Sequence, residues 1–135
     1  MPYDRRMPEL NAIGIVVSDM AASIRFYRLL GLELPDTPGE GHVEAPQPNG
    51  TRLMLDSEEV VRSFLPDWSR ETGNQVSLAF ECRSPAEVDD TYARVTGGGF
   101  EGSKEPWDAF WGQRYALLRD PDGVEVNLYS PLAGS

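Results

Sequence analysis

Apolar and polar residues follow two different periods along this chain, and each period predicts one type of element. Residues 11–17 and 76–82 alternate in side-chain character and are rich in β-branched or aromatic residues, which is typical of strands. The segment that follows 11–17 instead repeats apolar side chains at helical spacing, at Met20, Ile24, Tyr27 and Leu30. We therefore expect a strand followed by a helix near the start of the chain.

A second helix is predicted after Ser84. Ser84 is a suitable N-cap, and the glycines at 97–99 end the helical pattern. The first helix is bounded in the same way, by Ser18 or Asp19 at its start and by Gly31 at its end. The two halves of the chain thus begin alike.

Short strand-like runs follow each helix, so the sequence predicts the order βαβββ twice. These runs lie at 32–35, 41–45 and 51–56 in the first half and at 100–105, 113–119 and 124–130 in the second. We expect one domain over 1–135, with a first module at 9–56, a linker at 57–74 that includes a short helix, and a second module at 75–132. A repeat of this size predicts an α+β fold of two curved sheets, each covered by one helix.

Each predicted strand has one bulky apolar face and one small or polar face. In the last strand, Val124, Val126 and Leu128 alternate with Glu125, Asn127 and Tyr129. The bulky faces are expected to pack beneath the helices. The opposing faces of four strands favour a shared cavity, although a solvated sheet face gives the same alternation.

Charge and cysteine content narrow the functional classes. The 135 residues include 22 Asp and Glu against 12 Lys and Arg, a net charge of −10, which argues against binding nucleic acid or anionic lipid and permits a cationic ligand. The single cysteine, Cys82, forms no intrachain disulfide and suits the reducing cytoplasm. The apolar run at 13–17 is too short for a signal peptide or a membrane span. We expect a cytoplasmic protein.

Aromatic residues gather in the segment 105–115. Trp107, Phe110, Trp111 and Tyr115 lie within nine residues, and planar side chains suit a flat ligand. Packing against a partner subunit is the alternative for any one of them. If the sequence DPDG at 120–123 forms a four-residue hairpin loop, Arg114 lies beside Tyr129 on the cavity face. There Arg114 would hold an anionic or carbonyl group, or pair with one of the acids.

Two stretches carry a resemblance to a known family. "VVSDMAASIRFYRLLGLEL" and "RYALLRDPDGVEVNLYSP" resemble the vicinal oxygen chelate superfamily, which includes glyoxalase I, extradiol dioxygenases and bleomycin-resistance proteins. The resemblance extends over about residues 9 to 132. It implies two βαβββ modules whose curved mixed sheets surround a cavity, in a chain that is usually a homodimer.

The resemblance also implies where a divalent metal ion would bind in metal-dependent members. The four ligand positions correspond to Ala12, Met54, Ser77 and Asn127. Such members carry His, Glu or Gln there, whereas alanine has no donor atom and the other three are poor ligands. The only histidine, His42, is expected at the surface or the pocket rim, and Cys82 in the core. We therefore expect no metal, no cofactor and no metal-dependent glyoxalase or dioxygenase activity.

Binding without turnover is the favoured function. We expect a homodimer that sequesters an aromatic or polycyclic molecule, such as an antibiotic, as bleomycin-resistance proteins do. The expected ligand-binding residues are Met54, Ser77, Trp107, Phe110, Trp111, Arg114, Asn127 and Tyr129. The alternatives are a metal-free isomerase or lyase that uses one cavity carboxylate, Asp56 or Glu81, and a regulatory member with no small ligand.

Overall fold

The computed structural model describes residues 9–71 and 76–133. The first half forms a three-stranded sheet in the order β1-β3-β2, with β1 and β3 parallel and β2 and β3 antiparallel. Its elements are β1 (Ala12–Val17), α1 (Met20–Leu29), β2 (His42–Pro46) and β3 (Arg52–Ser57). The short helix α2 (Glu58–Phe64) follows β3 directly, which confirms the helix expected in the linker.

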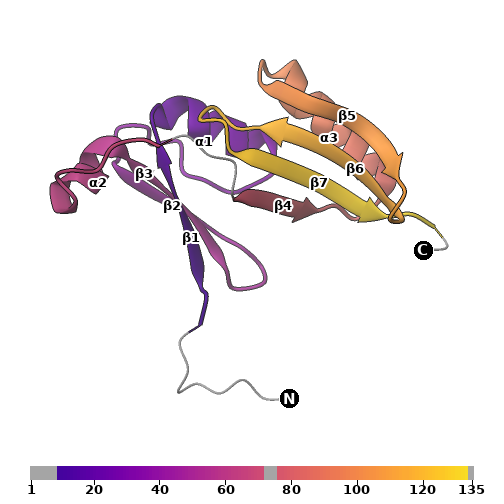
Figure 1. Ribbon diagram of the computed structural model, residues 1–135, viewed down its shortest axis with the longest axis horizontal. Helices are drawn as coiled ribbons and strands as arrows, with labels where there is room; N and C mark the ends of the chain where they lie inside the picture. Colours follow the sequence, from indigo (N-terminus) through magenta and orange to yellow (C-terminus); the bar gives the residue numbers. More distant parts are fainter. Residues whose placement is uncertain (1–8, 72–75, 134–135) are drawn as a thin grey trace.

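The second half forms a four-stranded sheet in the order β4-β7-β6-β5, in which only the β4–β7 pair is parallel. Its elements are β4 (Ser77–Glu81), α3 (Pro85–Gly97), β5 (Glu101–Ala109), β6 (Gln113–Arg119) and β7 (Glu125–Pro131). The helix α3 lies across one face of this sheet, and the two sheets are arranged side by side (Figure 1). The fold is α+β with mixed sheets, as predicted.

One predicted strand is absent from the first half. Residues 32–35 have no strand partner, so the first half has the order βαββ and only the second half is βαβββ. Leu32 and Leu34 are nevertheless buried in the hydrophobic core. This segment is irregular, but it packs against the core on one side only. One-sided packing gives the same alternation of apolar and polar residues as a strand.

Helix caps form as the sequence predicts. Asp19 caps α1 by accepting a hydrogen bond from the Ala22 backbone N–H at 3.1 Å, and Ser84 caps α3 by accepting one from Glu87 at 3.2 Å. Gly31 follows α1 with φ 106°, a left-handed conformation that other residues rarely adopt.

The core joins the two halves. A single cluster of buried side chains draws on α1, β1, β2 and β3 as well as on β4, α3, β6 and β7. At the helix junction, Phe26 packs edge-to-face on Phe100 with ring centroids 5.2 Å apart. Cys82 lies in this core, where burial raises the pKa of its thiol to about 11. The predicted role of Cys82 as small core filler agrees with this placement.

The DPDG turn has a shape that the sequence did not reveal. The Gly123 N–H donates to the Asp120 carbonyl at 3.0 Å, Gly123 has φ 87°, and the Asp120 N–H donates to the Val124 carbonyl at 2.9 Å. These features define a three-residue loop, a type I turn followed by a bulge at the left-handed glycine. The loop is one residue shorter than expected, so Arg119 pairs with Glu125.

Candidate functional site

An aromatic cluster lies on the face of the four-stranded sheet opposite α3. Trp107, Trp111 and Tyr115 form a triangle of edge-to-face contacts, with ring centroids 5.2–6.0 Å apart. Tyr115 also stacks on Tyr129 at 6.3 Å with an interplanar angle of 29°. We call these four residues the aromatic face. Edge-to-face and stacked arrangements are the geometries that aromatic rings prefer, so the cluster holds its shape without a ligand.

Strand register brings three of these residues into one row. Trp107 of β5 pairs with Tyr115 of β6, Tyr115 pairs with Tyr129 of β7, and Tyr129 pairs with Glu81 of β4. Directly opposite residues of neighbouring strands project to the same side of a sheet. The row therefore crosses all four strands, and its one formally charged member is the exposed Glu81.

The tip of the β5–β6 hairpin extends the aromatic face. Trp111 is 48% exposed and donates its indole N–H to the Gln113 side-chain oxygen at 2.9 Å. Phe110 contacts Trp111 edge-to-face at 5.1 Å but is 96% exposed. Phe110 therefore lies at the rim of the cluster and not in its floor.

Asn127 lies beside Tyr115 on the same side of the sheet. Its Nδ2 donates to the Tyr115 hydroxyl at 2.9 Å, while its Oδ1 is buried and has no hydrogen-bond partner among the described residues. A buried acceptor without a partner costs about 1–3 kcal/mol. A ligand donor would recover part of that cost only where a shift of the surrounding side chains exposed the Asn127 oxygen.

The predicted placement of Arg114 beside Tyr129 is wrong, whereas the alternative that Arg114 pairs with acidic residues is confirmed. Because the DPDG loop is one residue shorter than expected, Arg114 pairs with Ser130, and Tyr115 takes the place beside Tyr129. The Arg114 guanidinium points to the helix side, where it contacts Asp89 of α3 at 2.9 Å and Asp108 at 3.1 Å. Its role is to join α3 to the sheet. Tyr115, which the sequence placed in the aromatic segment but not in the site, is central to the cluster.

Met54 and Ser77 lie apart from the aromatic face. Met54 is half-buried on the open face of the three-stranded sheet, where it pairs with Gly14. Ser77 pairs with Glu125 and is thus two residues away from Asn127 in register, not level with it. The structure therefore brings Trp107, Trp111, Asn127 and Tyr129 together, with Phe110 at the rim, and leaves Met54 and Ser77 outside this group.

The side chains at the four implied metal positions do not fit a divalent ion. Ala12 offers no donor, Met54 a thioether, Ser77 an exposed hydroxyl, and Asn127 an amide whose nitrogen is already bonded to Tyr115. Divalent ions in such sites need imidazole, thiolate or carboxylate ligands. Within residues 9–71 and 76–133, no three His, Cys, Asp or Glu side chains converge as a metal site.

A charged network occupies the open face of the three-stranded sheet. His42 Nδ1 lies 2.5 Å from an Asp56 oxygen and His42 Nε2 lies 2.7 Å from a Glu44 oxygen, while Arg52 bonds the other Glu44 oxygen at 3.1 Å. Hydrogen bonds to Glu44 and Asp56 raise the pKa of His42, and the hydrogen bond to His42 lowers the pKa of Glu44. The two carboxylates flank opposite ring nitrogens, so they cannot share one metal ion with His42.

Sequence reasoning missed this network because its members come from two strands. His42 and Asp56 are 14 residues apart and meet only through the β2–β3 pairing. The two-residue spacing of His42 and Glu44, on one face of a predicted strand, was the available signal.

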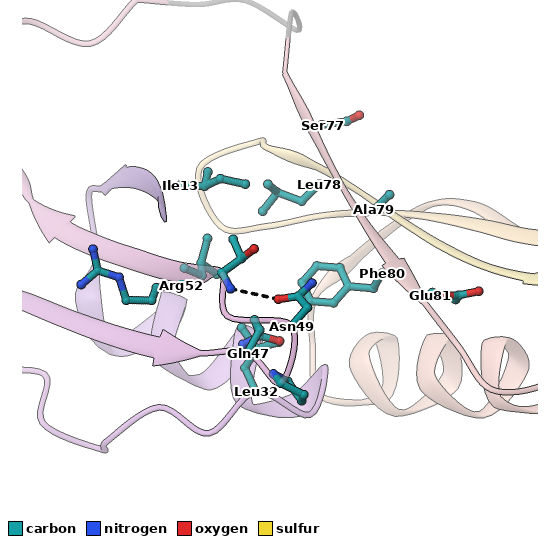
Figure 2. Close-up of a pocket in the computed structure, with 13 residues that line it drawn as sticks. Ile13, Leu32, Gln47, Asn49, Arg52, Ser77, Leu78, Ala79, Phe80 and Glu81 are labelled. Atoms are coloured by element: carbon teal, nitrogen blue, oxygen red, sulfur yellow. Dashed lines mark hydrogen bonds between the residues drawn. The ribbon is translucent and has the colours of Figure 1, made fainter. Parts of the chain in front are cut away.

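A groove of about 460 Å³ lies between the two sheets (Figure 2). In Figure 2, Leu78 and Phe80 of β4 point into the groove, toward Ile13 and the turn that holds Asn49, while Ser77 and Glu81 point to the other side of the strand. The Asn49 side chain accepts a hydrogen bond from the Thr51 N–H at 3.0 Å, which shapes this turn. The groove floor is apolar and belongs to the core side of both sheets.

Comparison with known families agrees with the fold. The family model described as "Glyoxalase/Bleomycin resistance protein/Dioxygenase superfamily" matches residues 9–128. The chain belongs to this superfamily. A search of curated protein sequences found no significant match.

Solved structures of the superfamily have the same fold. The chain is 28% identical to a glyoxalase/bleomycin resistance protein/dioxygenase from Nocardioides, with a TM-score of 0.74 and coverage of 96% of this chain and 87% of that one. A family enzyme from Burkholderia phytofirmans PsJN is 18% identical, with a TM-score of 0.79 and coverage of 93% and 100%. A lactoylglutathione lyase from Agrobacterium tumefaciens is 19% identical, with a TM-score of 0.66 and coverage of 93% and 96%. The last two structures, at 18% and 19% identity, show only that the fold is shared.

The superfamily contains both enzymes and resistance proteins, so membership leaves the function open. Among the described residues, no helix is long and apolar enough to cross a membrane.

Proposed function

We propose that this protein binds a planar aromatic or polycyclic small molecule on the aromatic face, without a metal ion, and thereby sequesters it. An antibiotic of the bleomycin type is the specific ligand class we favour. The observation that carries the proposal is the cross-strand row of Trp107, Tyr115 and Tyr129. Trp111 packs against this row, and Asn127, which bonds Tyr115, has a side-chain oxygen without a partner among the described residues. Rings supply stacking area, and one polar group fixes orientation, which is the usual composition of a small-molecule site.

We also propose that the protein forms a homodimer. β1 and β4 each lie at the edge of a sheet, and they carry or adjoin exposed apolar residues, Ile13 at 37% and Val76 at 68%. Exposed edges with apolar side chains favour covering by another chain. We propose that a second copy covers these edges and closes the aromatic face into a pocket, in the cytoplasm, where Cys82 stays reduced.

Two measurements test the binding proposal. Native mass spectrometry of the purified protein is expected to detect a bound small molecule, and titration with bleomycin and other planar antibiotics is expected to quench tryptophan fluorescence in the presence of a chelator. The control is Trp68→Ala. Trp68 is not part of the aromatic face, and its ring contacts Arg62 and Arg70 instead. If no compound copurifies and no planar antibiotic binds, the regulatory alternative replaces the proposal.

A second candidate function rests on the His42–Asp56 pair. A Cβ added at Gly14 would lie 4.0 Å from Asp56 Oδ2, so the glycine leaves room beside the carboxylate oxygen that His42 does not occupy. A carboxylate beside a protonated imidazole is a general base with a neighbouring acid, as a metal-free isomerase would need. Deuterium uptake by small α-hydroxycarbonyl compounds in D₂O tests this candidate. Uptake that persists in Asp56→Asn would exclude this carboxylate.

Glu81 and Glu125 do not form a catalytic pair. Both lie on the open face of the four-stranded sheet, but Glu81 is level with Tyr129 and Glu125 with Ser77. Four residues of strand separate them by about 13 Å, which is beyond the distance between paired catalytic carboxylates.

A further inference from the structure

The aromatic face already holds a cation from its own chain. The Lys104 ammonium nitrogen lies 4.0 Å from the ring centroid of Trp107, well inside the range of a cation–π contact. Lys104 is the only lysine in the sequence. Among the described residues, no carboxylate lies within ion-pair distance of its ammonium group, so the Trp107 ring is its recorded electrostatic partner.

A break in the strand pairing places this lysine over the ring. The β5–β6 register shifts between Gly102 and Lys104 and again between Lys104 and Trp107. In a regular strand, two residues three positions apart project to opposite faces, but a bulge reorients one of them. The irregular part of β5 therefore brings Lys104 and Trp107 to the same side of the sheet.

The surroundings favour a cation over an anion at this place. The one formally charged member of the cross-strand row is Glu81, and Arg114 is turned away toward α3. The face opposite α3 thus presents π-electrons and a carboxylate along this row, and the chain as a whole has a net charge of −10. A desolvated ring face attracts ligand cations in the same way as it attracts lysine.

We propose that Lys104 is an intramolecular occupant of the aromatic face that determines specificity: a ligand must displace its ammonium group from Trp107, so the ligand carries a cationic nitrogen on its planar ring system. This inference rests on the proposed function, because it assigns the charge of the ligand that binds there. A neutral planar molecule gains ring contacts at Trp107 but does not replace the lost cation–π contact. A cationic planar molecule replaces it.

A matched pair of probes tests the charge requirement. N-methylquinolinium is a permanent planar cation, and quinoline is its uncharged counterpart at neutral pH. Tryptophan fluorescence titration of the full chain is expected to show that the cation binds about threefold more tightly or better. In Lys104→Met, which keeps a long apolar side chain without the charge, affinity for the cation is expected to rise about threefold, because the competitor is gone. Lys104→Arg is the control that retains the charge.

The single lysine provides a second readout. Reductive methylation with ¹³C-formaldehyde labels Lys104 and keeps its charge, and ring currents from Trp107 shift its methyl signal. Saturation with N-methylquinolinium is expected to move that signal to the position seen in a Trp107→Ala variant.

The outcomes separate the two proposals. If both probes bind equally and the methyl signal stays in place, the role of Lys104 is wrong, while the aromatic face remains a binding site. If Lys104→Met weakens binding of the cation, Lys104 is a contact and not a competitor, which also overturns the inference. If neither probe binds at millimolar concentration, the aromatic face is not a binding site and both proposals fail.

Discussion

The hydroxyl of Tyr27 donates a 2.8 Å hydrogen bond to the carboxylate of Asp120, which lies 93 residues further along the chain. Tyr27 is fully buried in α1, and Asp120 begins the turn between β6 and β7. The other Asp120 oxygen accepts the N–H groups of Asp122 and Val124. One carboxylate thus shapes the turn and joins it to the helix of the other half. Burial raises the pKa values of both Tyr27 and Asp120.

Tyr27→Phe is expected to lower the free energy of unfolding by about 2 kcal/mol, because a buried carboxylate loses one donor. Urea denaturation measures the change. Tyr92→Phe is the matched control, since its half-buried hydroxyl has no recorded hydrogen bond within the described residues, and we expect a change within about 0.5 kcal/mol. Equal effects of the two substitutions would show that the Tyr27–Asp120 bond adds nothing to stability.

Trp111→Ala and Trp107→Ala are each expected to weaken binding of a planar antibiotic by roughly thirtyfold, equivalent to about 2 kcal/mol. Both remove a ring from the aromatic face without opening the buried core. Asn127→Ala is expected to cost about 1 kcal/mol, because one neutral hydrogen bond is lost. Fluorescence titration, with Trp68→Ala as the control, measures these changes. Unchanged affinity in both tryptophan variants would assign the cluster to subunit packing.

Stability is expected to fall as the pH rises above about 6.5, the ordinary pKa of histidine. Contacts with Glu44 and Asp56 raise the pKa of His42 in the folded state. Because the pKa of His42 is higher in the folded state than in the unfolded state, its contribution to the free energy of unfolding is fully present below the unfolded-state pKa. This contribution is lost as the pH rises through the folded-state pKa. Arg52 completes the set of charged groups in this network through its hydrogen bond to Glu44.

His42 is the only histidine, so NMR titration of its ring protons reports this pKa directly. His42→Gln is expected to flatten the dependence of unfolding free energy on pH in this range. A measured His42 pKa at or below 6.5 would contradict the expectation.

Chelators are expected to leave the melting temperature unchanged, because Ala12, Met54, Ser77 and Asn127 do not provide a ligand set. An ion that bound only the folded state would raise stability by ~2.7 kcal/mol at a hundredfold excess over its dissociation constant. Thermal melts with zinc, nickel, manganese or iron at micromolar levels measure this. A clear upward shift with any of them would refute metal independence.

Sedimentation is expected to show a dimer. Association with a second chain would cover the free edges of β1 and β4 and the open faces of both sheets. Ile13→Lys would place a charge beside the β1 edge and shift the equilibrium toward monomer. Ile13 is part-exposed in the single chain, so the folded monomer should tolerate the change. A species of 15.0 kDa at high micromolar concentration would contradict the dimer.

Sequence pattern alone determined the helices, their caps, the helix-facing sides of the strands and the presence of the aromatic segment. These features are local: Asp19 and Ser84 cap helices through bonds to residues three positions away. The sequence alone also shows that all four implied metal positions carry poor ligands. This conclusion depends only on side-chain type and on the spacing of each position from a motif.

Tertiary structure decided which residues meet. The DPDG loop closes with three residues instead of four, and that one-residue difference turns Arg114 toward α3 and Tyr115 toward the aromatic face. The β2–β3 pairing brings His42 to Asp56, and two register shifts in β5 bring Lys104 over Trp107. Successive side chains of a strand project to opposite faces, so a register shift of one residue exchanges the faces. Turn shape and bulges set that register. Small differences in backbone conformation distinguish one strand register from another, and the same sequence is compatible with more than one.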